Sequence, residues 1–214
     1  DIASAREEKY LSPGLNPIVS DSSIEDDLKR RDFSINSIAY EISRNKIYDP
    51  FNGISDIKRK ELNLLHKDSI SDDPSRLLRG TKYATRFGFK ISKDSLYQAQ
   101  RVLNNWPWKY TKNNYGFKFP PGISIRIRME LSEIFKYDNL IEIIKTLAEW
   151  RVLSLLDENI KLDNKFIRGL SWIKRLNGNS ILYLIKDSKS LEIISDRFLI
   201  NQKEKIYLEE FLEI

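Results

Sequence analysis

The sequence changes character at residue 72, and this change limits the possible folds more than any other feature. Asp72 and Asp73 precede Pro74, and a proline in the first turn is typical of a helix start because its missing N–H would have no partner there. Beyond this point apolar residues recur at helical spacing, and Gly88 suits a C-terminal cap. Before it, short strand-like runs alternate with turn residues. We therefore expect an α+β fold that is mostly α.

An irregular segment later in the chain suggests a further division. Residues 106–122, WPWKYTKNNYGFKFPPG, contain three prolines and two glycines among aromatic and basic residues. Such a composition is typical of a loop or linker. We expect three regions: mixed α and β at 1–66, a helical region at 67–121, and a second helical region at 122–214.

The expected elements of the first region are short and are separated by turn-forming residues such as Asn52-Gly53. We expect strands at 1–6, 46–50 and 61–66, a loop at 10–23, a helix starting at Ser23 and one or two helical turns at 54–60. The expected later helices are 74–88, 93–103, 124–137 and 139–150, with shorter ones to the C-terminus. Two amphipathic stretches near the C-terminus suit core helices better than a partner surface.

Two residue types limit the chemistry. The chain has no cysteine, which excludes disulfides, thiolate nucleophiles and cysteine metal sites. His66 is the only histidine, so the chain cannot build a two-histidine metal site, and we expect His66 to be structural.

The charge of the chain favours a polyanionic partner. The formal net charge is +5 and the pI is about 9.2, which suits nucleic acid or nucleotide phosphates, although such values are also common in proteins without these partners. No apolar run approaches the roughly 20 residues of a membrane span. We expect no membrane partner.

The segment EDDLKRRDFSINSIA, residues 25–39, carries the most specific charge pattern. Arg30 and Arg31 are adjacent and must point to different sides of a helix or strand, and Asp32 follows at once. One arginine held by a carboxylate and one free guanidinium would suit a nucleotide, because the guanidinium can bind phosphate as a fork. A salt-bridged helix end has the same spacing, so both interpretations remain open at this point.

A second cluster of charges follows in DDPSRLLRGTKYATRFGF, residues 72–89. Asp73 and Arg76 are three residues apart, which places them side by side on a helix. The cations continue with Arg79, Lys82 and Arg86 on one broad face. Cations on one face repel each other unless an anion meets them, but a solvated surface helix would also show this pattern.

Several segments, in order and spacing, resemble the class II tRNA nucleotidyltransferase (CCA-adding enzyme) and bacterial poly(A) polymerase family. EDDLKRRDFSINSIA resembles its DL-RRDFTIN-A-A motif, DPFNGISDI its DP-x-G-x-x-D-L element, and DDPSRLLRGTKYATRFGF its D-P-x-R-x-L-R-x-x-R-F-A-x-R segment. DIASAREEKY resembles the strand before the first motif, and SIRIRMEL the start of the family's body domain. The resemblance spans residues 1 to about 135.

The resemblance implies a role for each region. Residues 1–66 would be the C-terminal part of the nucleotidyltransferase head, 67–121 a neck that recognises the base, and 122–214 an RNA-binding body. A cytoplasmic enzyme would add CCA, A only or CC only to the tRNA 3′ end from CTP and ATP. A poly(A) polymerase of the same family, or a non-catalytic RNA-binding module that has lost its active site, are the alternatives.

The resemblance also implies roles for individual residues. Arg31 would contact the phosphate or ribose of the nucleoside triphosphate, with Asp32 and Asn36 shaping that wall. Asp73 and Arg76 would present the edge that pairs with the incoming base.

Two further positions, Arg79 and Lys82, would touch phosphates. The family usually has arginine at the position of Lys82 and glutamate at that of Asp72, and lysine keeps the charge but loses the guanidinium fork. Lys82 would therefore contact phosphate as a single point charge and not as a fork.

The catalytic metal ligands are expected outside this chain. In the family, the RNA 3′ hydroxyl attacks the α-phosphate with two Mg²⁺ ions bound by a D-x-D motif after a G-G-x-x-R-D loop, and neither motif occurs here. Asp1 is a candidate third carboxylate. We expect the chain to begin downstream of the metal ligands and to be inactive alone, within an active parent protein. The aromatic and basic residues of 106–119 could stack on RNA, but packing between neck and body is the better interpretation.

Overall fold

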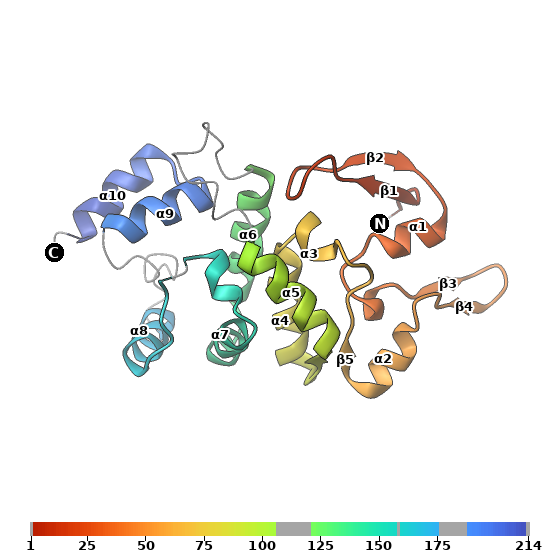
Figure 1. Cartoon of the computed structure of the whole chain (residues 1–214). Coiled ribbons are helices and arrows are strands. Elements are labelled where there is room, and N and C mark those ends of the chain that lie inside the picture. The colour runs from red at the N-terminus through yellow and green to blue at the C-terminus, as the bar shows by residue number, and fades with distance from the viewer. Residues whose placement is uncertain (1, 106–120, 158, 176–187, 213–214) are drawn as a thin grey trace. The chain divides into compact units, whose positions relative to one another are not determined.

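The computed structural model describes residues 2–105, 121–157, 159–175 and 188–212 (Figure 1). The chain divides into two units, Asp1–Asn104 and Asn105–Ile214. In the described residues the first unit mixes short strands with helices, and the second has only helices. This confirms the expected α+β, mostly α fold. The expected regions 1–66 and 67–121 both contribute to the first unit, and their division into head and neck stays a prediction.

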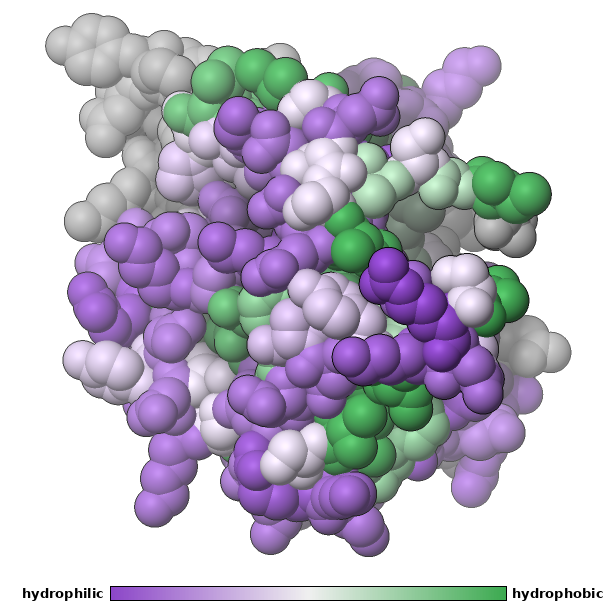
Figure 2. Space-filling model, turned by 90° about the vertical axis from the view of Figure 1, so that its right-hand side faces the viewer, coloured by the Kyte–Doolittle hydropathy of each residue, from purple (hydrophilic) through white to green (hydrophobic). Residues whose placement is uncertain are grey.

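The strands of the first unit form small two-stranded sheets. β1 (Arg6–Lys9) pairs antiparallel with β2 (Ile18–Asp21), β3 (Ala39–Glu41) antiparallel with β4 (Lys46–Tyr48), and β5 (Glu61–Leu62) parallel with β6 (Lys90–Ile91). The antiparallel pairs are hairpins and close locally, whereas the parallel pair brings together segments almost 30 residues apart. Figure 2 views the molecule from the side of the β3–β4 hairpin and shows a mostly hydrophilic surface with hydrophobic side chains in separate patches.

The helices of the first unit begin and end at recognisable signals. They are α1 (Ile24–Lys29), the 3₁₀ turn η1 (Ser34–Asn36), α2 (Gly53–Arg59), α3 (Ser69–Asp72), α4 (Ser75–Phe87) and α5 (Lys93–Asn105). The Ser23 hydroxyl caps α1 by accepting the Asp26 N–H at 3.1 Å. Gly88 ends α4 with φ at 67°, a left-handed conformation that suits glycine. The helix starts expected at Ser23 and next to Pro74 are confirmed.

Phe33 connects the segment after α1 to α4. Its side chain is completely buried, its backbone forms a bridge with Leu64, and its ring meets the Tyr83 ring edge-on at 6.1 Å. Leu77 and Leu78 of α4 are also completely buried. The core of the first unit therefore holds the two charged segments of the sequence against each other.

A close backbone approach explains why the DPFNG element has a glycine at position 53. A Cβ at this position would lie 2.3 Å from the carbonyl oxygen of Ser34, so no larger residue fits without displacing the backbone. The Asp49 carboxylate accepts the N–H groups of Gly53 at 2.7 Å and Ile54 at 2.9 Å. Helix α2 thus packs directly on η1. The 3₁₀ turn η1 follows Arg30, Arg31 and Asp32, which we call the RRD segment.

The second unit consists, in its described residues, of amphipathic helices with buried aliphatic faces. Its elements are α6 (Pro121–Ile134), α7 (Leu140–Glu149), the 3₁₀ turn η2 (Val152–Leu155), α8 (Asn164–Arg175), α9 (Ser188–Phe198) and α10 (Gln202–Leu212). On α7 the buried residues are Leu140, Ile143, Ile144 and Leu147, as the spacing predicts. α6 packs against α9, and α7 against α8. No helix in the described parts of the chain is long and apolar enough to cross a membrane.

Several expected boundaries are wrong. The strand expected at 1–6 begins only at Arg6, and the loop expected at 10–23 contains strand β2. The strand expected at 61–66 is limited to Glu61–Leu62. Residues 106–120, with the aromatic and basic segment, lie outside the described residues, and the predictions for them stay predictions.

Candidate functional site

Arg30 and Arg31 share one buried carboxylate, that of Asp27. Its Oδ1 accepts Arg30 Nη2 at 2.7 Å and Nε at 3.1 Å, and its Oδ2 accepts Arg31 Nη2 at 3.0 Å. Burial would raise the pKa of Asp27, but the hydrogen bonds from the two arginines outweigh it, so the pKa is lowered. Asp27 therefore stays charged and holds both guanidinium groups in place.

Asp32 links the RRD segment to α4. It is 7% exposed, and its Oδ1 accepts the Phe33 N–H at 2.9 Å and the Asn36 Nδ2 at 2.8 Å. Its Oδ2 accepts Arg79 Nε at 2.9 Å, from a residue 47 positions later in the chain. A buried carboxylate is stable only when such donors surround it. Asp32 thus acts first as a connector between two motifs.

Asp73 and Arg79 complete the connection at the start of α4. Asp73 is 5% exposed. Its Oδ1 accepts hydrogen bonds from the Ser75 N–H at 3.1 Å and from the Ser75 hydroxyl at 2.6 Å. Its Oδ2 lies 3.4 Å from Arg79 Nη2. The Arg79 guanidinium therefore bridges the carboxylates of Asp32 and Asp73. We call these three residues the Asp32–Arg79–Asp73 cluster.

Arg76 is 4% exposed and donates to the protein backbone. Its Nη2 donates to the Arg30 carbonyl at 2.7 Å, and its Nη1 donates to the Arg31 carbonyl at 3.1 Å and to the Ser69 hydroxyl at 2.8 Å. His66 Nε2 lies 3.4 Å from Nη1. The cations Arg76 and Arg79 are thus met by groups of the chain itself, and α4 is not the solvated basic helix that its spacing alone allows.

The remaining predicted residues differ in their exposure and contacts. Arg31 has a side chain that is 41% exposed, and its Nη1 donates to the Asn36 carbonyl at 3.0 Å. Lys82 lies one turn beyond Arg79 on α4 and is half-buried. Asp1, the candidate third carboxylate, lies outside the described residues.

Sequence reasoning missed Asp27, Glu8 and Tyr10. Asp27 could have been found, because it precedes Arg30 and Arg31 by three and four residues on a helix. Glu8 Oε1 accepts Arg30 Nη1 at 2.9 Å, and its Oε2 accepts the Tyr10 hydroxyl at 3.1 Å. Burial and the charge of Glu8 raise the pKa of Tyr10 to about 12. These two residues reach the site only through tertiary structure, so the sequence gives no sign of them.

The start of α4 also holds an acid in an unfavourable environment. Burial raises the pKa of Asp72 to about 6; the charge of Arg76 opposes this shift, and the charges of Asp68 and Asp73 add to it. Burial and Arg76 lower the pKa of His66, which favours its neutral form.

The described residues do not fit a magnesium site. They include no group of three histidine, cysteine, aspartate or glutamate side chains that could hold a metal ion. The buried carboxylates Asp27, Asp32 and Asp73 are instead bound by arginines. In the described residues these carboxylates are therefore engaged by guanidinium groups and are not arranged around a metal ion.

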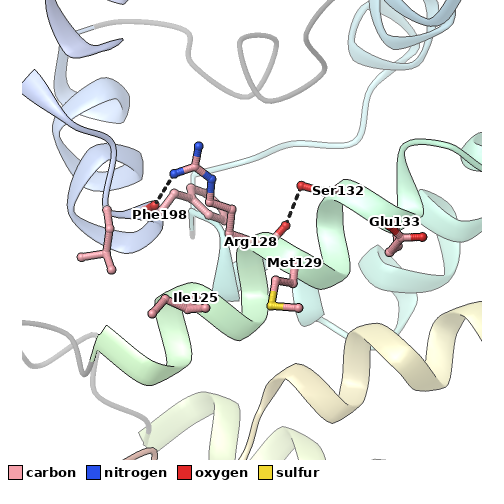
Figure 3. Close-up of a pocket in the computed structure, with 7 residues that line it drawn as sticks. Ile125, Arg128, Met129, Ser132, Glu133 and Phe198 are labelled. Atoms are coloured by element: carbon pink, nitrogen blue, oxygen red, sulfur yellow. Dashed lines mark hydrogen bonds between the residues drawn. The ribbon is translucent and has the colours of Figure 1, made fainter. Parts of the chain in front are cut away.

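The described part of the second unit contains a pocket (Figure 3). It has a volume of about 350 Å³ and is lined by Ile125, Arg128, Met129, Ser132, Glu133, Phe198 and Leu199. Arg128 donates to the Phe198 carbonyl at 3.4 Å and lies 3.5 Å from Glu204. Arg128, the cation among the lining residues, is thus partly neutralised. The lining includes none of the residues predicted to contact the nucleotide.

Comparison with known proteins connects the sequence to one family. A family model of the poly(A) polymerase head domain matches residues 1–63. The A-adding tRNA nucleotidyltransferase of Halalkalibacterium halodurans is 44% identical over 96 residues, which is 44% of this chain and 22% of the relative. That of Aquifex aeolicus is 30% identical over 179 residues, 82% of this chain and 20% of the relative. The CC-adding enzyme of Deinococcus radiodurans is 35% identical over 106 residues, 48% of this chain and 28% of the relative.

The chain thus spans about a fifth of the length of the first two relatives.

Solved structures support the fold. A CCA-adding enzyme in apo form II superposes with a TM-score of 0.77 at 23% identity, over 99% of this chain and 51% of the other. The Thermotoga maritima CCA-adding enzyme complexed with tRNA has a TM-score of 0.68 at 22% identity, over 92% of this chain and 51% of the other. The motifs, the fold and the relatives agree, and the chain belongs to the class II tRNA nucleotidyltransferase (CCA-adding enzyme) and poly(A) polymerase family.

Proposed function

We propose that the protein adds nucleotides to the 3′ end of tRNA without a template, and that this chain selects the nucleotide and holds the RNA. The observation that carries the proposal is the Asp32–Arg79–Asp73 cluster, which joins the RRD motif to the start of α4. The names of the relatives, A-adding and CC-adding tRNA nucleotidyltransferases, support tRNA as substrate. Related structures with ATP and with CTP support nucleoside triphosphates.

Arg31 is the proposed contact for the nucleotide phosphate or ribose. A guanidinium has five N–H groups, and the bonds to Asp27 and to the Asn36 carbonyl occupy two of them. The remaining donors can bind phosphate oxygens while Asp27 keeps the group oriented. Asp32 and Asn36 form the wall behind it. Arg79 and Lys82 are the proposed phosphate contacts further along α4.

Asp73 and Arg76 are the proposed contacts for the base. Cytosine and adenine both carry an exocyclic amine that can donate to a carboxylate, whereas uracil presents an oxygen at that position. A carboxylate oxygen can accept more than one hydrogen bond, so Asp73 Oδ2 is the proposed acceptor for such an amine beside its 3.4 Å contact with Arg79. Arg76 would have to share the hydrogen bonds that it now makes with the Arg30 and Arg31 carbonyls. We therefore propose Asp73 as the main discriminator against UTP.

The proposed reaction is attack of the RNA 3′ hydroxyl on the α-phosphate, with pyrophosphate leaving. Mg²⁺ is part of this proposal, and its ligands would have to come from residues other than those described here.

Nucleotide incorporation tests the function directly. The full-length protein that contains this chain is incubated with Mg²⁺, labelled CTP or ATP, and tRNAs that end before the first C, after CC, or after CCA. Addition of C, of A or of both on the first two tRNAs would identify CC-adding, A-adding or CCA-adding activity. Long A tails on unrelated RNA would identify a poly(A) polymerase. Absence of incorporation on every RNA would contradict the proposal and favour a non-catalytic RNA-binding module.

Substitution of Asp73 tests the base contact. Asp73→Ala should blur the choice between CTP, ATP and UTP more than it slows turnover with ATP. Asp68→Ala is the matched control, because Asp68 is a neighbouring but exposed acid. An unchanged nucleotide preference in Asp73→Ala would argue against the base-reading role.

A further inference from the structure

Helix α8 presents a stripe of exposed side chains with an unusual composition. The stripe consists of Lys165, Arg168, Trp172 and Arg175. Steps of three, four and three residues place all four on one side of the helix. Phe166 and Leu170, on the other side, are buried. We call the exposed set the α8 stripe.

Trp172 is the chemical centre of the stripe. It is 60% exposed, and the Arg175 guanidinium lies 5.6 Å from its ring centroid. An indole this exposed contributes little to the core of the unit. Aromatic rings beside arginines are the chemistry with which proteins stack nucleic-acid bases and bind the adjoining phosphates.

The charges of α8 are not explained by helix stability. The helix has four basic residues and no acidic one. Lys174 and Arg175 lie in its last turn, where cations favour the helix dipole, but Lys165 and Arg168 lie in its first half, where cations do not. Arg168 and Arg175 are both exposed. The α8 stripe therefore has a positive field that suits a polyanion.

RNA fits this surface better than an anionic membrane does. A helix that lies on a membrane inserts a continuous apolar face, and the apolar side of α8 is already buried within its own unit. A single exposed tryptophan among cations instead suits a sugar-phosphate backbone with one accessible base. We infer that the α8 stripe contacts tRNA, with its arginines on phosphates and Trp172 stacked on an exposed base. The inference rests on the proposed function for its RNA substrate, but it concerns binding and not catalysis.

Equilibrium binding tests the inference. Fluorescence anisotropy measures the Kd of the full-length protein for a labelled tRNA ending in CC, without nucleoside triphosphates, over a series of salt concentrations. Trp172→Ala should weaken binding by about 5- to 100-fold with little change in the salt slope, because stacking is not ionic. Trp172→Phe should retain most of the affinity. Arg168→Ala should reduce the slope of log K against log salt by about 1.

Two controls make the test specific. Tyr97 on α5 is 64% exposed with the Arg101 guanidinium 5.9 Å from its ring, but its helix also carries Asp94. Tyr97→Ala should change the Kd by less than about 2-fold. Lys145→Ala removes one exposed charge of the same unit and should leave the Kd similarly unchanged. Thermal unfolding checks that each variant is folded.

Three outcomes would overturn the inference. The first is an unchanged tRNA affinity in folded Trp172→Ala, and the second is an equal loss in Tyr97→Ala. The third is binding to phosphatidylserine vesicles that the stripe variants lose while tRNA binding persists. Failure of the proposed function is distinguishable, because the wild-type protein would then add no nucleotide yet still bind tRNA in a Trp172-dependent manner.

Discussion

Helices α4 and α8 have the same charge but differ in where their arginines lie. Each contains four basic residues and no acidic one. In α4, Arg76 and Arg79 turn toward the carbonyls and carboxylates of the RRD segment. In α8, Arg168 and Arg175 are exposed beside Trp172. The comparison shows that a basic helix acts as an internal connector where its arginines are buried against groups of a distant segment, and as an external surface where its arginines stay exposed.

The largest effect expected from this contrast is at Asp32. Asp32→Ala removes the carboxylate that accepts hydrogen bonds from Phe33, Asn36 and Arg79, including the Arg79 contact at 2.9 Å. We expect the free energy of unfolding to fall by about 3 kcal/mol, as is typical when one member of a buried ion pair is removed. Urea unfolding of the full-length protein measures it.

The matched control is Asp138, the fully exposed acid that lies 3.6 Å from Lys174 of α8. Asp138→Ala should change the free energy of unfolding by less than about 0.5 kcal/mol. An equal loss in the free energy of unfolding for Asp32→Ala and Asp138→Ala would contradict the difference between a buried partner of α4 and an exposed partner of α8.

A smaller but clear effect is expected at Arg76. Arg76→Ala deprives the Arg30 and Arg31 carbonyls of their donors, and we expect a loss of about 2 kcal/mol in the free energy of unfolding. Arg168→Ala on α8 is the control, and it should cost less than about 0.5 kcal/mol because Arg168 is exposed. Thermal and urea unfolding of both variants test the difference. A loss in Arg168→Ala as large as that in Arg76→Ala would contradict it.

The smallest effect concerns Asp72, whose pKa is raised to about 6 in the folded protein. An unfolded aspartate titrates near pH 4, so the folded state binds the proton more tightly. The stability that this group contributes is therefore present at low pH and is lost as pH rises from about 4 through 6. Asp72→Asn should flatten this dependence and, because solvent screens a half-exposed carboxyl, raise the free energy of unfolding at pH 7 by only about 1 kcal/mol.

Urea unfolding of wild type and Asp72→Asn at pH 4, 5, 6 and 7 checks this prediction. Contributions from other acids, such as Asp27, cancel in the difference between the two proteins. The variant should match the wild type near pH 4 and exceed it at pH 7. Parallel curves would show that the surroundings of Asp72 do not disfavour its charge.

Local signals predicted the helical part of the fold well. Ser23, Pro74 and Gly88 act through the backbone of their own helix, so their meaning can be read without knowing the rest of the structure. Strand β2 was missed because Ile18–Asp21 is short, exposed and next to Pro17, and its pairing with β1 is decided by the hairpin rather than by apolar alternation.

The motifs predicted some residues of the candidate site but not their connections. The structure joins Asp32 and Asp73 through Arg79 and places Arg76 on the Arg30 and Arg31 carbonyls, while the roles of these residues toward a nucleotide stay predictions. A helical wheel of α4 gives Arg76 and Arg79 the same character, yet it cannot show that two carbonyls from the RRD segment arrive beside Arg76. That information depends on chain segments more than 40 residues apart.

These long separations affect how the site is assembled in time. The bonds of Arg76 to the Arg31 and Arg30 carbonyls span 45 and 46 residues, and closing so long a loop costs entropy before any contact compensates for it. Helix α4 can form early from its local signals, whereas the wall that we propose for the nucleotide must await the docking of the RRD segment. Contacts of this range slow folding. Competence to bind a nucleotide should consequently appear late, as one of the last properties that the folding chain acquires.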